Sequence, residues 1–433
     1  MTFSGLLKWI RATFDAGGWR APWLMVRYAR LVILNRTSKN RLITSVPQRK
    51  EPRLPDIALS PRDEPDGDVV IPIYNNFTDT ISLLAALDND TSINGRIILV
   101  HDCSTDDRLS PALRGFAARR DHTTLLENER NLGFVETCNR GMAESTRDVV
   151  ILNTDIGLPR GAVRRILNRL QSDSGIATVT PYSNLAYGVG IPDLLYENTL
   201  PFGAQIEEID RSLQSIASVA EIRLPAGVGF CMGMSRRALS ALGGFDKNFG
   251  LGYGEETDFC LRADAIGMKN VLASDVFVAH HRGKSFGATW QEKSRKGTLK
   301  VLARHPNYVS GKLESYLQQG EARAVALVAL VRLAEELSGE KTRIRDRVQS
   351  ETDPPASAAR YPELTIVEKP GCTSATLNYA NESYRFQFSG RDLVSQTLAL
   401  VPSAARSISE NELSVEFYQV LTGFTGKPRR SPE

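Results

Sequence analysis

The chain has 433 residues, of which 42% are hydrophobic and 24% charged, and its formal net charge is +3. This composition is ordinary for a soluble globular protein, and the length suits one large α/β domain with additional segments. A net charge this small does not favour nucleic-acid binding. The five widely spaced cysteines form neither a zinc pattern nor a disulfide framework, which favours a reducing cytoplasm.

Residues 1–45 are expected to form a basic, amphipathic helical arm. Lysine and arginine are frequent there, Asp15 is the single acid, and three tryptophans lie between them. This pattern is typical of a segment on an anionic membrane surface, and the alternative is an arm packed on its own domain. No apolar run is long enough for a membrane span, and no secretory signal is expected. Residues 46–67, rich in proline and charge, are predicted to be a linker.

From residue 68 onward, short apolar runs alternate with amphipathic stretches. The predicted strands are 68–73, 96–100, 123–126, 148–152 and 176–180, and the predicted helices are 78–87, 111–120, 134–143 and 161–171. This alternation predicts the α/β class with a mostly parallel central sheet. Ligands of such sheets bind at the carboxyl ends of the strands.

The C-terminal third is expected to be an addition to this domain. Residues 311–350 are predicted to be a helical extension, with one long helix over 322–348, and residues 351–361 to be a second linker. Residues 362–433 are predicted to form a small β-rich accessory region with strands at 364–367, 373–378 and 383–388.

Polar residues follow three of the predicted strands. The first strand ends in Pro72-Ile73-Tyr74-Asn75, which is not the glycine-rich turn of a dinucleotide or nucleotidyltransferase fold. After the second strand, Asp102 can accept a hydrogen bond from a base or a ribose. After the fourth strand, Asp155 is a candidate ligand for Mg²⁺ or Mn²⁺, which complete their coordination with phosphate oxygens and water.

Three carboxylates fall within four positions in the string Gly252–Arg262. Glu255 and Glu256 are expected at the start of a helix, where backbone N–H groups can hold a carboxylate. A carboxylate held in this way can act as a general base. On this string alone, a capped surface helix is the alternative interpretation.

The chain resembles the family 2 glycosyltransferases, the large inverting group with the GT-A fold, over about residues 67–290. Several strings match in the family's order: Pro72–Asn75, His101–Asp106, Asn131–Phe134, Leu152–Asp155 and Gly252–Arg262. The resemblance implies a GT-A domain over 68–310. The last of these strings, with Thr180–Asn184, is similar to the rhamnosyltransferase-like branch, which acts in surface polysaccharide assembly.

The resemblance implies roles for individual residues. The nucleotide sugar would be held by Pro72, Tyr74, Asp102, Asn131, Asn153 and Asp155. His101 replaces the family's first aspartate and could orient Asp102 or touch the ribose. A divalent cation, Mn²⁺ or Mg²⁺, would be held by Asp155 and His280, with Asn153 in place of the usual first carboxylate.

The resemblance further implies that Glu256 is the base that deprotonates the acceptor hydroxyl, with Glu255 as the alternative. Asp258 and Arg262 would position the acceptor, although Asp258 could instead cap the helix and pair with Arg262. The expected partners are a UDP-, dTDP- or GDP-linked sugar and a glycan or lipid-linked glycan acceptor at the inner face of the plasma membrane. The other hypothesis is a catalytically silent sugar-binding or scaffold protein with this fold.

Overall fold

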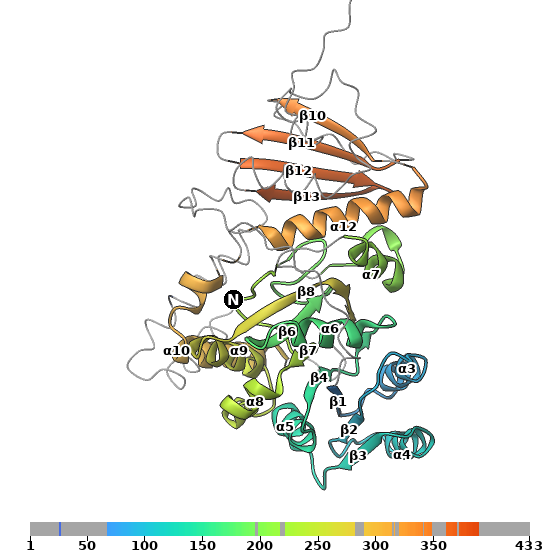
Figure 1. Cartoon of the computed structure of the whole chain (residues 1–433), viewed down its shortest axis with the longest axis vertical. Helices are drawn as coiled ribbons and strands as arrows, with labels where there is room; N and C mark the ends of the chain where they lie inside the picture. The colour runs from blue at the N-terminus through green and yellow to red at the C-terminus, as the bar shows by residue number, and fades with distance from the viewer. Residues whose placement is uncertain are drawn as a thin grey trace, which may run out of the picture.

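The computed structural model of the chain describes residue 26 and residues 67–194, 198–216, 221–281, 290–313, 316, 320–340, 342–348, 361–369 and 372–388. Apart from residue 26, the predicted arm over 1–45 lies outside these residues. The predicted linkers over 46–67 and 351–361 lie outside them too, apart from Gly67, which begins the first strand, and Tyr361. Among the described residues, no helix is both long and apolar enough to cross a bilayer. Figure 1 shows a large α/β part and a small separate sheet at the C-terminal end.

The large part is built on a seven-stranded sheet in the order β3-β2-β1-β4-β7-β6-β8. Its strands are β1 (Gly67–Ile73), β2 (Ile97–His101), β3 (Thr123–Glu127), β4 (Asp148–Leu152), β6 (Ile176–Tyr182), β7 (Cys231–Met234) and β8 (Lys269–Phe277). Only β7 runs antiparallel to its neighbours. A separate two-stranded ladder pairs β5 (Ile156–Gly157) with β9 (Ala279–His280).

Helices cover both faces of this sheet (Figure 1). One face packs against α3 (Phe77–Asp88), α4 (Leu109–Arg119), α6 (Ala162–Gln171), α7 (Ile206–Gln214) and α12 (Glu321–Ser338). The other face packs against α5 (Phe134–Glu144), α8 (Arg236–Leu242), α9 (Glu255–Ala265) and α10 (Trp290–Arg304). Because both faces are covered, β1 and β2 are buried at every position, as is usual for parallel sheets.

The predicted α/β class with a mostly parallel sheet is confirmed, and the five strands and four helices predicted up to residue 180 are all present with ends within two residues. The strand order reverses direction next to β1, since β2 and β3 lie on one side of it and β4 on the other. The carboxyl ends of β1 and β4 therefore meet where ligands of open α/β sheets commonly bind.

The C-terminal region contains the predicted small sheet, with strands β10 (Arg343–Val348), β11 (Glu363–Lys369), β12 (Cys372–Tyr379) and β13 (Glu382–Phe388). The helix predicted over 322–348 is wrong in its second half. α12 ends at Ser338 because Gly339 takes a left-handed conformation (φ 69°), and 343–348 pairs with β11 as a strand. The charged sequence of β10 hid this strand, because its side chains give no apolar alternation.

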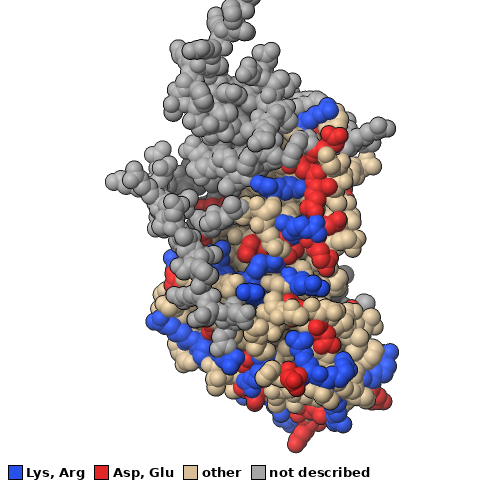
Figure 2. All heavy atoms as spheres, turned by 45° about the vertical axis from the view of Figure 1, so that its right-hand side comes forward, with Lys and Arg blue, Asp and Glu red and all other residues tan. Residues whose placement is uncertain are grey.

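The small sheet contacts the large part through Phe202, which follows a short turn before α7. The Phe202 ring packs edge-on against Tyr379 and Tyr384, with ring centres 5.3 Å away in each case. The backbone N–H of Phe202 also donates to the Glu382 carboxylate over 2.9 Å. The β12–β13 hairpin is thereby fixed to the α/β part. On the face drawn in Figure 2, the described acidic and basic residues are intermixed, so this face has no large patch of one sign.

Candidate functional site

The predicted site residues gather at the carboxyl-end edge of the central sheet. Tyr74 follows β1, Asp102 follows β2, and Asn153 and Asp155 follow β4, which is the neighbour of β1. Tyr74 and Asn153 are half-buried, and Asn131 is exposed. Pro72 is buried inside β1 opposite Val100.

Asp102 is buried and already bonded on both carboxylate oxygens. Its Oδ1 accepts from the Leu132 N–H and the Asn128 side-chain amide, each over 2.7 Å, and its Oδ2 accepts from the Gly133 N–H over 2.9 Å. The Asp102 carboxylate therefore holds the loop that carries Asn131 in place. Such a set of backbone donors leaves little capacity for the base contact that the resemblance implied.

His101 is buried and helps to shape the next turn. Its Nε2 accepts the N–H of Ser104 over 3.2 Å, so the ring proton is on Nδ1, which lies 3.7 Å from the Glu127 carboxylate. Ser104 in turn accepts the N–H of Asn75, whose side chain accepts from Thr105. The neutral ring of His101 thus accepts a hydrogen bond at Nε2 and turns the proton on Nδ1 toward Glu127. An ionised aspartate has only acceptors and could not supply that proton.

Asp155 and His280 face each other across the β5–β9 ladder. Asp155 Oδ1 lies 3.5 Å from His280 Nε2, and both side chains are largely buried. The Nδ1 of His280 lies 3.2 Å from the carbonyl oxygen of Leu185, which can only accept, so the proton of a neutral ring belongs on Nδ1. The Nε2 lone pair then points toward a carboxylate, an arrangement that a cation between the two would favour.

The donor set fits a divalent cation in part. Burial alone would raise the pKa of Asp155. With no cation between them, a protonated His280 would donate from Nε2, and this hydrogen bond with the positive charges of protonated His280 and His281 outweighs burial, so that the pKa lies below its usual value. The carboxylate is therefore ionised at neutral pH. Asn153 adds a buried Oδ1 with no hydrogen-bond partner. Among the described residues no group of three His, Cys, Asp or Glu could hold a metal ion, so a cation here needs phosphate oxygens to complete its shell.

Glu255 and Glu256 open α9, as predicted, after a turn with Gly254 at the N-cap. Glu255 is only 3% exposed and its Oε2 has no hydrogen-bond partner. Glu256 is half-buried, and its Oε2 accepts the N–H of Gly254 over 3.2 Å. The more accessible of the two carboxylates is therefore Glu256.

Both glutamates have raised pKa values. Burial raises the pKa of Glu255 well above its usual value, and the charge of Glu256 raises it further. Burial also raises the pKa of Glu256, against hydrogen bonds that lower it. Two carboxyl groups this close share their protons, and the deeper burial of Glu255 makes it the protonated member. Glu256 is left as the candidate base.

The loop before β7 connects the two halves of the site. The Phe230 ring stacks on His280 with centres 5.3 Å apart, and the Phe230 carbonyl accepts the N–H of Asn153 over 2.9 Å. One residue earlier, a Cβ on Gly229 would lie 3.6 Å from the Cβ of Glu256. The sequence singled out no role for this loop. The string Gly227–Cys231 also resembles a string of the family 2 pattern, but that resemblance gave no hint of these long-range contacts.

The comparisons with known proteins bear on this arrangement. Residues 68–243 match the family model described as glycosyl transferase family 2. This segment is therefore similar to the family 2 glycosyltransferases. The matched segment includes Asp102 and Asp155 and ends before Glu255, Glu256 and His280. No match is found among the curated proteins.

Three solved structures are similar to this chain. They are the mannosyltransferase PcManGT from Pyrobaculum calidifontis with GDP-Man and Mn²⁺ (18% identity, TM-score 0.47, 77% of this chain and 88% of that one); GalNAc-T7 with UDP, GalNAc and Mn²⁺ (14%, 0.43, 59% and 54%); and TarS 1–349 of S. aureus (12%, 0.37, 63% and 82%). Similarities of this size say nothing of this chain's donor, metal or acceptor.

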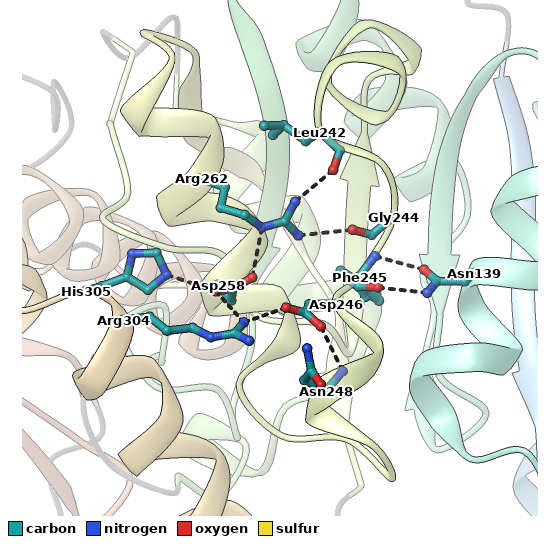
Figure 3. Close-up of polar contacts among 10 residues, drawn as sticks. All are labelled: Asn139, Leu242, Gly244, Phe245, Asp246, Asn248, Asp258, Arg262, Arg304 and His305. Carbon is teal, nitrogen blue, oxygen red and sulfur yellow. Dashed lines mark hydrogen bonds and ion pairs between the residues drawn. The ribbon is translucent and has the colours of Figure 1, made fainter. Parts of the chain in front are cut away.

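Asp258, which is buried, and Arg262, which is partly exposed, belong to a polar cluster beyond the matched segment 68–243 (Figure 3). The Asp258 carboxylate contacts Arg262 Nε at 2.8 Å, His305 Nε2 at 2.9 Å and Arg304 at 3.3 Å. Arg262 also donates to the carbonyls of Leu242 and Gly244. The predicted pairing of Asp258 with Arg262 is present. Both side chains are engaged within the protein, so the geometry favours a structural role over the predicted positioning of the acceptor.

We expect Asp258→Asn to lower the stability of the protein, because it removes the buried counter-charge of Arg262 and the acceptor of His305, while Arg304 keeps its ion pair with Asp246. Breaking a buried ion pair costs about 3 kcal/mol, which should lower the melting temperature by several degrees. Asp264→Asn is the matched control, since Asp264 lies at the exposed end of the same helix and pairs only with Lys312 among the described residues. An equal melting temperature for wild type and Asp258→Asn would contradict the structural role.

The same carboxylate should contribute to acid sensitivity. Burial alone would raise the pKa of Asp258, but His305 and Arg262 hold it below its usual value. Its stabilisation is therefore complete above the unfolded pKa of about 3.9 and is lost as the pH falls through the lower, folded pKa. The difference in stability between wild type and Asp258→Asn should shrink over that acid range.

Proposed function

We propose that the protein transfers a sugar from a nucleotide-diphosphate donor to a hydroxyl of a glycan acceptor, with inversion at the anomeric carbon and with the help of a divalent cation. One observation carries this proposal: a cation-compatible pair, Asp155 and His280, and a buried carboxylate pair, Glu255 and Glu256, are joined by one loop, 229–230. The family 2 match supports the sugar-transfer class.

The geometry supports a proposed role for each of these residues. A divalent cation at Asp155 and His280 would supply charge stabilisation for the diphosphate leaving group. Glu256 takes the proton of the acceptor hydroxyl while that oxygen attacks the anomeric carbon. The bond from the anomeric carbon to the diphosphate oxygen breaks in the same step. A single displacement inverts the anomeric configuration and needs no carboxylate nucleophile.

The biological setting is also a proposal. The rhamnosyltransferase-like strings support a deoxyhexose or hexose donor and a role in surface polysaccharide assembly. The basic, tryptophan-bearing residues 1–45 support a cytoplasmic enzyme held at the inner face of the membrane, where a lipid-linked acceptor would be reached.

The test is a panel of UDP-, dTDP- and GDP-linked sugars, measured for binding and for release of nucleoside diphosphate with Mn²⁺, with Mg²⁺ and with a chelator. Metal-dependent release from one donor supports the proposal. Binding without turnover, even with lipid-linked acceptors present, favours the silent sugar-binding protein.

A separate cell fractionation tests the proposed membrane contact of the arm. A protein lacking residues 1–45 should move from the membrane to the soluble fraction. If it stays with the membrane, the arm is not the anchor.

A further inference from the structure

The side chain of Asn184 continues a backbone ladder past the end of β6. β6 ends at Tyr182, whose carbonyl accepts the N–H of Val278 over 2.9 Å. Two residues further along both segments, Asn184 Oδ1 accepts the N–H of His280 over 2.8 Å, and its Nδ2 donates to the His280 carbonyl over 3.3 Å. The orientation of the amide follows from these partners, because an N–H only donates and a carbonyl only accepts. Asn184 thus bonds to His280 as a neighbouring strand would.

His280 depends on this neighbour because β9 has only two residues. Its ladder places His280 opposite Ile156, and the N–H of His281 donates to the Asp155 carbonyl over 2.8 Å. The backbone groups of successive residues in a strand point to opposite sides, so those of His280 point away from β5 and toward Asn184. Without the amide, both groups of this largely buried residue would lose their partner, which is costly.

The segment 184–185 also fixes the ring of His280. The Nδ1 of the imidazole lies 3.2 Å from the carbonyl oxygen of Leu185, and Phe230 stacks on the ring with an angle of 17° between the planes. The remaining ring nitrogen, Nε2, lies 3.5 Å from Asp155 Oδ1. Two neighbouring residues therefore hold both the backbone and the ring of the histidine, and together they direct Nε2 toward the carboxylate.

Asn184 is itself held by the loop that follows β6. Its carbonyl accepts the N–H of Asn198 over 2.9 Å. The preceding residue, Ser183, donates its N–H to Val189 over 3.0 Å and accepts the N–H of Ile191 over 2.8 Å. The Asn184 side chain is buried. The amide that bonds to His280 is thus attached to a loop whose own backbone is hydrogen-bonded.

The chemistry of metal ligation says what this arrangement can do. A histidine that binds a metal ion is usually oriented by other protein groups, and the loss of one such group typically weakens metal binding about 10–100-fold. The Asp155 and His280 pair offers a single carboxylate, so the position of the imidazole matters more than in a site with several charged ligands.

We propose that Asn184 is a positioning residue of the cation site, where its amide holds His280 so that Nε2 meets a divalent cation beside Asp155. This inference rests on the proposed function. It also gives a physical role to the string Thr180–Asn184, whose last residue reaches across to the β5–β9 ladder.

The test measures Mn²⁺ affinity in the presence of UDP, dTDP or GDP, which needs neither sugar nor acceptor. Asn184→Ala should weaken Mn²⁺ binding about tenfold. Asn139→Ala is the matched control, because the Asn139 amide makes the same two bonds to the N–H and carbonyl of Phe245, each over 2.8 Å (Figure 3). Its loss should lower the melting temperature but keep Mn²⁺ affinity within about twofold of wild type.

A double-mutant cycle shows whether Asn184 acts through His280. In a His280→Ala background, Asn184→Ala should change Mn²⁺ affinity by less than about twofold, because the imidazole that it positions is absent. If Asn184→Ala does not fold, Asn184→Asp enters the same cycle. It keeps the shape and the acceptor for the His280 N–H and loses only the donor. Any direct attraction between the new charge and the cation is present in both backgrounds and is subtracted, so a loss of at least about threefold should remain that depends on His280.

Equal effects of the Asn184 variants with and without His280 overturn the inference, and so does an equal loss of Mn²⁺ affinity in Asn139→Ala. If Asp155→Ala binds Mn²⁺ as tightly as wild type, no cation lies at this pair, and the proposed cation role fails together with the inference. If Mn²⁺ binds as expected but no sugar of the donor panel is transferred, the proposed function fails, and the cycle still decides the role of Asn184.

Discussion

Replacing Glu256 by Gln should lower kcat by about 10²–10⁴-fold, the usual contribution of a general base, while the donor still binds. Glu256 is the half-buried member of the carboxylate pair, and Gly254 holds one of its oxygens. Glutamine keeps the size and the hydrogen bond from Gly254 but cannot take a proton. The measurement is nucleoside diphosphate release with acceptor present, alongside donor affinity by calorimetry.

Glu255→Gln is the matched control one residue away. Burial and the charge of Glu256 raise the pKa of Glu255 well above its usual value, so this carboxyl group is already neutral. Glutamine imitates a neutral carboxyl group in size and polarity, and we expect kcat to fall less than about tenfold. The opposite pattern, an active Glu256→Gln and an inactive Glu255→Gln, would move the base to Glu255 and leave the rest of the mechanism in place.

The pH dependence gives a second check on the same residue. The base must be ionised, and burial raises the pKa of Glu256. Transfer should therefore fall as the pH drops through this raised pKa, at a higher pH than the value of about 4.3 of an ordinary glutamate. In Glu256→Gln the small remaining rate should lose this acid limb. An acid limb that persists in the variant would belong to another group.

The sheet and its helices could be predicted because their signals are local. The buried runs at 68–73 and 148–152 show continuous apolar patterns that belong to covered parallel strands. The strand β10 was missed because its charged sequence carries no such pattern. Gly339 is a usual residue at a helix end, but the predicted helix was extended past it through the charged residues up to 348. The sequence therefore predicted strands and helices correctly wherever their buried side chains follow a regular apolar pattern.

The site was predicted less completely, because roles depend on partners far away in the chain. Glu255, Glu256, Asp155 and His280 were located by their motifs, and the structure brings each pair together. A motif does not show whether a carboxylate is already bonded to other groups of the protein. Asp102 is occupied by the loop before α5, and Asp258 by His305, 47 residues further on. The sequence distance from Asp102 or Asp258 to its partner follows no helical or strand period, so the sequence could not reveal either contact.

Asp155→Ala should abolish the metal dependence of donor binding and lower transfer by about 10²–10³-fold, because the cation's stabilisation of the leaving diphosphate is worth several kcal/mol. Asp155 is the single carboxylate of the predicted cation pair, and Asn153 provides only a neutral oxygen. Mn²⁺ titration in the presence of UDP, dTDP or GDP measures the loss directly and does not depend on knowing the acceptor.

His280→Ala should also weaken Mn²⁺ binding and lower the rate of transfer, but by less than Asp155→Ala. It removes a neutral ligand and leaves the charge of Asp155. The neighbouring His281 supplies the control: it is exposed, and its contact with Asp155 is a backbone N–H donated to the Asp155 carbonyl over 2.8 Å. His281→Ala keeps that backbone bond, so Mn²⁺ affinity should stay within about twofold of wild type. If His281→Ala and His280→Ala weaken Mn²⁺ binding equally, the ladder rather than the imidazole supports the cation, and His280 is not a ligand.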